Sequence, residues 1–188
     1  MSESVTELLA AYRAGDGQAL DNLASLLYPE LKRMAERRAR SSAGSGATTL
    51  VHETFLKLLA GGALRPNDRR EFFGLTATIM RQVIVDEVRR ATAEKRARRD
   101  VTLAETIIGD DSHEKAQFLL HVDEMMALLE REDERLARVF ECRYFAGLST
   151  AETAEVIDAS ERTVERLWRA SRSRMAELLE EPGEPDGR

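Results

Sequence analysis

The chain has 188 residues, 43% of them hydrophobic, and a formal net charge of −6 at pH 7. A single cysteine excludes an internal disulfide framework, and no apolar run approaches the roughly 20 residues that span a bilayer. The first residues lack the basic and apolar regions of a secretory signal, so we expect a cytoplasmic protein without a membrane segment.

The charges are unevenly distributed along the chain. Residues 81–100 contain seven Lys or Arg and four acids, and residues 160–175 contain five Arg and two acids. Residues 104–134 lie between them and contain ten acids and two bases. Two basic segments therefore flank an acidic one, and such local segments matter more than the net charge for binding a polyanion. In the free protein the acidic segment is a candidate to shield the two basic segments, by attracting them electrostatically within the chain. The alternative is that it is a solvated spacer.

Helical periodicity accounts for most of the first hundred residues. Aromatic residues make up 5% of the chain, and the abundance of Ala, Leu, Glu and Arg favours helices. Apolar residues recur at three and four residues through the second helix, where Pro29 is a candidate for a kink or a break. Phe72 and Phe73 begin an apolar run, and we expect them in the core. We expect one helix around residues 8–12 and others at about 16–40, 50–59 and 70–90 or beyond.

The rest of the chain divides into a linker and a second helical block. Residues 100–122 have weak periodicity, and we interpret them as a flexible acidic linker with some helical character. We therefore predict an all-α protein with two small helical domains, one at residues 1–99 and one at residues 123–181. Residues 182–188 are expected to be a disordered tail. Cys142 lies among apolar residues, which indicates a buried thiol.

The second block has the pattern of a helix-turn-helix. Ser149 with Glu152 three residues later predicts a capping box at the start of a short helix, and the tight turn at residues 158–160 leads into a second helix. Arginine contacts phosphates and bonds guanine edges bidentately, so the basic outer face of the second helix is a candidate DNA-binding surface. The alternative is a helical hairpin with a solvated charged face. The outer face carries Arg162, Arg166, Arg169 and Ser173, with Thr163 and Glu165 at its margins.

Three motifs occur in order along the chain: LVHETFLKLL at residues 50–59, RQVIVDEVRR at residues 81–90 and a segment at residues 147–175. Together they resemble sigma factors of the extracytoplasmic-function (ECF) class. LVHETFLKLL at residues 50–59 is similar to the LVQETFLRL segment of that family, and RQVIVDEVRR at residues 81–90 is similar to its RN-x-x-x-D-x-x-RR run. Residues 147–175, which begin GLSTAETAEV, are similar to its carboxy-terminal helix-turn-helix. The chain departs from the family at two places. His52 replaces the usual glutamine, and residues 46–49 read GATT where many members have an acidic D-A-E-D stretch.

The resemblance implies a transcription factor without chemistry of its own, with no catalytic residue, cofactor or metal. Its amino-terminal domain would bind the clamp of the largest subunit of the RNA polymerase core enzyme and recognise the −10 promoter element. Its carboxy-terminal domain would read the −35 element of promoter DNA. The residues implied are Leu50, His52, Glu53 and Leu56 for polymerase binding, Arg81, Asp86, Arg89 and Arg90 for the −10 element, and Arg162, Thr163, Arg166 and Arg169 for the −35 element.

Thr48 and Thr49 stand where relatives carry carboxylates, at the start of the expected polymerase-binding helix. One interpretation is an N-cap, because threonine caps helices well. The other is a phosphorylation switch, because a phosphothreonine adds about −1.5 to −2 charges at pH 7 and would restore acidity against a basic clamp. A serine/threonine kinase is then a candidate partner, and an anti-sigma factor is the other candidate means of control. A helical wheel places Leu50, Val51, Thr54, Phe55 and Leu58 on the core face and Thr49, His52, Glu53 and Leu56 on the opposite face.

Two functions of other classes remain open. The sequence HETFL begins like the H-E-x-x-H motif of zinc proteases, but Leu56 occupies the position of the second histidine, and the chain has only three histidines. We therefore expect no metal site. The nearer alternative is a stand-alone helix-turn-helix regulator, which would bind duplex DNA without polymerase.

Overall fold

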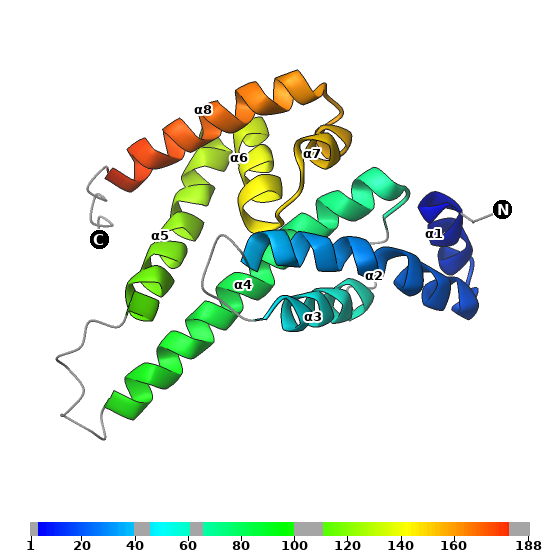
Figure 1. Ribbon diagram of the computed structural model, residues 1–188, viewed down its shortest axis with the longest axis horizontal. Coiled ribbons are helices and arrows are strands. Elements are labelled where there is room, and N and C mark those ends of the chain that lie inside the picture. Colours follow the sequence, from blue (N-terminus) through cyan, green and yellow to red (C-terminus); the bar gives the residue numbers. More distant parts are fainter. Residues whose placement is uncertain (1–3, 40–45, 61–65, 100–110, 181–188) are drawn as a thin grey trace.

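The computed structural model describes residues 4–39, 46–60, 66–99 and 111–180, and these ranges contain helices and no strand (Figure 1). The predicted all-α class is confirmed. None of the described helices is long and apolar enough to cross a membrane. The predicted tail at residues 182–188 lies outside the described residues. The helices are α1 (Val5–Arg13), α2 (Gly17–Ala39), α3 (Ala47–Ala60), α4 (Arg69–Arg99), α5 (Asp111–Glu132), α6 (Glu134–Phe140), the π-helical turn η1 (Glu141–Phe145), α7 (Thr150–Ile157) and α8 (Glu161–Glu180).

Helix α2 runs through Pro29 as a single helix of 23 residues, so the proline does not split it. Pro29 and Ser25 are both exposed, which places the missing hydrogen bond on the solvent side, where water is able to replace it. On the opposite side Leu27, Leu31 and Met34 are completely buried. The burial of this apolar stripe holds the helix together across the proline.

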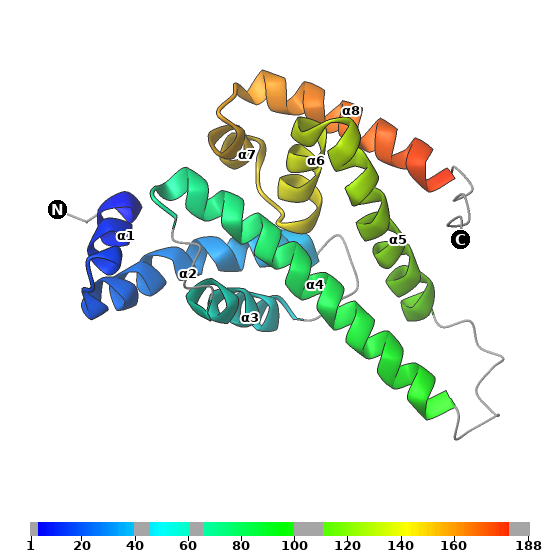
Figure 2. The same cartoon turned by 180° about the vertical axis from the view of Figure 1, so that it is seen from behind.

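Helix α4 is the central element of the fold. It is 31 residues long, and its middle is buried as its apolar sequence predicts: Phe73, Ala77 and Met80 are almost inaccessible to solvent. Helix α3 packs on one side of α4, whereas α5, η1 and α7 pack on the other, and α2 packs against α1 and α3 (Figures 1 and 2). Helix α8 lies on the outside of α5, α6 and α7.

The predicted linker differs from the structure in its second half. Residues 100–110 lie outside the described ranges, but residues 111–122 form the first half of α5, which continues without a break to Glu132. The helix is stable there because Leu119 and Val122 are buried, in the same apolar cluster as Val85 of α4. Periodicity indicated only a weak helix at this point, since the apolar partner of these residues comes from a distant part of the chain.

The buried apolar residues join the amino-terminal and carboxy-terminal helices. One cluster contains the core of α1–α4 and, from the carboxy-terminal helices, also Cys142, Ala146, Leu148 and Val156. The burial of Cys142 is as predicted. The two groups of helices therefore share a common core in this structure.

Candidate nucleic-acid interface

The carboxy-terminal helices include a short helix, a tight turn and a long helix. Ser149 and Glu152 form the expected capping box at the start of α7: the Ser149 N–H donates to Glu152 Oε2 at 2.6 Å, and the Glu152 N–H donates to Ser149 Oγ at 3.2 Å. Asp158 ends α7 in the left-handed conformation, with φ 52° and ψ 57°. Ser160 then caps α8 by accepting the N–H of Thr163 at 3.2 Å. Local capping fixes both ends of the turn.

Helix α8 has one buried face and one exposed basic face. Val164, Leu167, Ser171, Met175 and Leu178 are buried. Arg162, Arg166 and Arg169 are exposed on the other side, in agreement with the periodicity of the sequence. The arginine side chains of the candidate −35 surface are therefore accessible from solvent in this structure.

Two other side chains of α8 are held by neighbours. Thr163 is half-buried, and its hydroxyl lies 2.9 Å from Ser160 Oγ, so it belongs to the cap rather than to the open basic face. The Trp168 ring is half-buried, with its centroid 5.6 Å from that of Phe140. This tryptophan therefore packs against the core of the carboxy-terminal helices.

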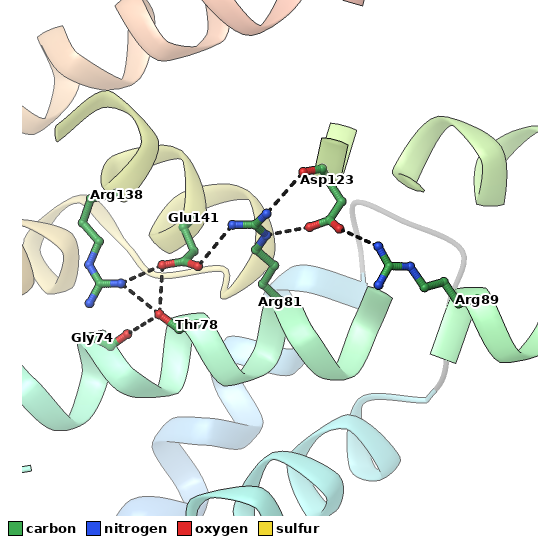
Figure 3. A network of polar contacts seen from close by, with 7 residues as sticks. All are labelled: Gly74, Thr78, Arg81, Arg89, Asp123, Arg138 and Glu141. Atoms are coloured by element: carbon green, nitrogen blue, oxygen red, sulfur yellow. Dashed lines mark hydrogen bonds and ion pairs between the residues drawn. The ribbon is translucent and has the colours of Figure 1, made fainter. Parts of the chain in front are cut away.

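The four residues implied for −10 recognition do not form one free surface on α4. Arg81 donates from Nε to Asp123 Oδ1 at 2.7 Å, and its side chain is 20% exposed. Arg89 contacts the other oxygen of the same carboxylate at 3.3 Å (Figure 3). Asp86 lies on another face and pairs with Lys57 of α3 at 2.7 Å. Arg90 is exposed. In this structure two of the three implied arginines face the carboxy-terminal helices.

Helix α3 presents an outer face that agrees with the helical wheel. Val51 and Thr54 are buried, whereas His52 is exposed and Leu56 is 54% exposed. Leu50 is only 5% exposed and belongs to the core. The structure therefore does not place Leu50 among the side chains available to a partner, although the motif includes it.

The interpretation of Thr48 or Thr49 as an N-cap is wrong. Helix α3 begins at Ala47, so the two threonines are its second and third residues. The carbonyl of Gly46 accepts the N–H of Leu50 at 3.2 Å, which puts Gly46 in the capping position. Both threonines are exposed, so they stand in the open first turn of the helix.

A polar group that the sequence did not single out lies where α4 meets the carboxy-terminal helices. Glu141, in the π-helical turn, has a side chain that is 8% exposed and accepts from Arg138 at 2.6 Å and from the Thr78 hydroxyl at 3.1 Å (Figure 3). Arg81 lies 3.8 Å from its other oxygen. π-Helical turns often occur at functional sites, and this one directs a carboxylate at α4.

Two ionisable groups of η1 and α7, Cys142 and Glu152, have shifted pKa values. Burial raises the pKa of the Cys142 thiol to about 12. Burial also opposes ionisation of Glu152, but hydrogen bonds from Ser149 and the charge and hydrogen bond of Arg37 outweigh it, and the pKa of Glu152 is lowered. The Arg37 guanidinium, on α2, lies 2.7 Å from this carboxylate. No group of three or more His, Cys, Asp or Glu side chains within the described ranges is able to hold a metal ion.

Comparison with protein families gives one match. The family model of the ECF sigma factors matches residues 2–181, which is nearly the whole chain and includes all three motifs described above. Comparison with curated proteins gives no match.

Proposed function

The chain belongs to the ECF sigma factor family, a family of non-enzymatic transcription factors. From this premise we propose which of its helices recognise each promoter element. It acts as an alternative sigma factor in transcription initiation, with RNA polymerase and promoter DNA as its partners. In our proposal α8 reads the −35 element and α4 reads the −10 element. We also propose that the protein acts in the cytoplasm. The observation that supports this most is the row of exposed arginines, Arg162, Arg166 and Arg169, on a helix that follows a capped turn.

Polymerase binding is assigned to the outer face of α3. Apolar surface is costly to leave in water, at roughly 25 cal/mol per Å², and Leu56 is 54% exposed on this face. His52 and Glu53 complete the surface that we propose for the polymerase clamp.

In vitro transcription separates this function from the nearest alternative. Core polymerase and the full chain are incubated with fragmented genomic DNA, and transcript starts are mapped. A sigma factor produces starts at a defined set of promoters only when core enzyme and protein are both present. A stand-alone helix-turn-helix regulator instead binds duplex DNA without polymerase and produces no such starts. The second result would overturn the proposal.

We further propose that Thr48 or Thr49 is phosphorylated by a serine/threonine kinase and that this strengthens polymerase binding. Both hydroxyls are exposed in the first turn of α3, where negative charge is favoured by about 0.3–1 kcal/mol. The family's usual acidity is missing at these positions, and phosphorylation would supply it next to His52 and Glu53. Since neither residue is the N-cap, a capping role no longer explains the pair. An anti-sigma factor remains the other candidate means of control.

The test of the switch is the affinity of the full chain for core polymerase before and after treatment with a cognate kinase. We expect tighter binding after treatment, and we expect Thr48→Ala with Thr49→Ala to abolish the change. Thr6→Ala is the matched control, because Thr6 is an exposed second residue of α1 as Thr48 is of α3. Tight binding by the untreated protein that does not change on kinase treatment would refute the switch and leave the sigma function intact.

A further inference from the structure

A carboxylate lies on the basic face of α8. Glu165 is exposed, three residues after Arg162 and four residues before Arg169, and this spacing places it on the same side of the helix as both arginines. The buried face at Val164 and Leu167 points the other way. The surface that we propose for the −35 element is therefore not uniformly basic, because an acidic side chain stands among its arginines.

Glu165 is not neutralised by the arginines around it. Glutamate and arginine four residues apart commonly pair on a helix surface, but the side chain of Glu165 forms no hydrogen bond or ion pair with another residue of the described ranges. Further along the same helix, Arg174 pairs with Glu132 at 2.7 Å and with Glu177 at 2.9 Å. The Glu165 carboxylate is therefore available to accept hydrogen bonds from a partner.

Phosphates are unfavourable partners for this carboxylate. Duplex DNA carries one negative charge for about every 1.7 Å of its axis, so the phosphates would repel Glu165 unless it accepted a hydrogen bond inside the groove. In helix-turn-helix proteins the first residues of the second helix contact the base edges. Glu165 is the fifth of the 20 residues of α8. Its place in the helix thus favours contact with a base.

The chemistry of the base edges selects cytosine. In the major groove the hydrogen-bond donors are N4 of cytosine and N6 of adenine. Adenine also presents the acceptor N7 beside N6, and this acceptor would repel the second oxygen of a carboxylate. Cytosine presents only its donor, and the guanine paired with it presents N7 and O6, which suit an arginine. A carboxylate next to Arg162 and Arg166 therefore fits a base pair of cytosine and guanine.

We propose that Glu165 is a specificity-determining residue that accepts a hydrogen bond from N4 of a cytosine in the −35 element. The inference rests on the proposed function, because it takes α8 as the helix that reads this element. Good base contacts discriminate by about 5-fold to 150-fold, and a single hydrogen bond from N4 belongs at the low end of this range. Replacing that cytosine should therefore weaken transcription about fivefold or more.

A promoter library randomised over the −35 element identifies the base that Glu165 reads. Core polymerase and the full chain transcribe the library, and barcodes in the transcripts give the preference at every position. Glu165→Gln removes the charge and keeps the size of the side chain, and an amide pairs with N6 and N7 of adenine. We expect this variant to prefer adenine to cytosine at one position, by about fivefold or more. Glu165→Ala should lose the preference for cytosine there and gain none for adenine.

Glu180→Gln is the matched control for the loss of a carboxylate. Glu180 is exposed at the other end of α8, about 22 Å from Glu165 at roughly 1.5 Å per residue. This variant should keep every preference of the wild type. Circular dichroism of the full chains shows whether the variants keep their helices, as the exposure of both residues leads us to expect.

The outcomes separate cytosine reading from other roles of the carboxylate. If Glu165 only repels phosphates, both of its variants raise transcription from all sequences alike and no preference changes. If it only orients an arginine, both variants weaken the same preference equally and neither gains one for adenine. Either result overturns the proposal.

A selection without polymerase separates this inference from the proposed function. If the wild type supports no promoter-specific transcription, the sigma function fails. The same randomised duplex, bound by the full chain alone and sequenced, then tests the contact of Glu165 with cytosine. Identical base preferences of the wild type and Glu165→Gln in that selection, or no selection by either, would overturn the inference as well.

Discussion

Glu53 on α3 and Glu87 on α4 bring two carboxylates of like charge together where these helices pack. Burial raises the pKa of Glu87, the charge of Glu53 raises it further, and Arg90 opposes both. The fold thus tolerates a repulsive pair next to the α3 surface that we assign to polymerase. A basic partner surface would relieve this repulsion, since it favours the ionised form of both groups.

Replacing Glu87 by Gln should stabilise the free protein at neutral pH. The folded-state pKa of Glu87 lies above its ordinary value of 4.5, so protonation favours the folded state. That contribution is complete below about pH 4.5 and is lost as the pH rises through the folded pKa. We expect a gain of about 0.5 kcal/mol or less at pH 7, typical of a surface change, which disappears at pH 4.

Thermal unfolding of Glu87→Gln at both pH values provides the measurement. Glu94→Gln is the control, because Glu94 is exposed on the same helix. A loss of stability at pH 7 would contradict the repulsive role of Glu53.

Replacing Arg166 or Arg169 by Ala should impair −35-dependent transcription without unfolding the protein. Both side chains are exposed and lie away from the buried face at Val164 and Leu167. A good bidentate base contact is worth about 1–3 kcal/mol, which corresponds to a loss of roughly 5-fold to 150-fold in promoter affinity. Run-off transcription on promoters with altered −35 sequences measures the effect.

Arg131→Ala is a suitable control for these variants, because Arg131 is an exposed arginine in the last turn of α5. If both α8 variants keep the wild-type promoter preference, the recognition face is assigned to the wrong residues.

Local sequence signals predicted the helices and the cap of α7 well. The capping box of Ser149 and Glu152 depends on residues three apart, and the buried faces of α3 and α8 follow from helical periodicity. The start of α3 was expected near Leu50, three residues too late. Its first turn consists of Ala47, Thr48 and Thr49, which have no apolar periodicity to mark them.

Contacts between distant residues were not predictable from the sequence. Arg81 and Asp123 are 42 residues apart, and charge patterning showed only that an acidic segment lies near two basic ones. It did not show which carboxylate meets which arginine. Glu141 has one local partner, Arg138 three residues earlier, but its burial depends on Thr78 and Arg81, which come from α4. The motif likewise included Leu50 as a polymerase contact, although the core buries it.

Cys142 should react slowly with maleimide reagents in the native protein. Its side chain is completely buried, and a pKa of about 12 keeps the thiol protonated at pH 8. Since the thiolate is the nucleophile, protonation and burial both oppose modification. We expect a rate at least tenfold below that of the chain in denaturant, and a faster rate in Asp123→Ala, because Cys142 shares its apolar cluster with the amino-terminal helices.

Mass spectrometry of the intact chain follows this reaction. Glu124→Ala is the control for Asp123→Ala, because Glu124 is the exposed neighbouring carboxylate and lies 3.5 Å from His121. Rapid modification of the native protein at pH 8 would show that Cys142 is accessible and that the common core is not present in solution.

Removing the cap of α7 should destabilise the protein, and removing its carboxylate should do so in a pH-dependent way. Ser149→Ala is expected to lower the free energy of unfolding by about 1 kcal/mol, as for other N-caps.

Glu152 has a lowered pKa in the folded state, so its stabilising contribution is complete above its ordinary pKa of 4.5 and is lost as the pH falls through the folded value. Glu152→Gln should therefore be less stable than the wild type by a constant amount from pH 6 to pH 8, and the difference should vanish in acid. Denaturant unfolding over this pH range measures it, with Glu165→Gln as an exposed control on α8. A difference that persists unchanged below the folded pKa would show that the hydrogen bonds of Glu152 to Ser149 and Arg37 do not depend on its charge.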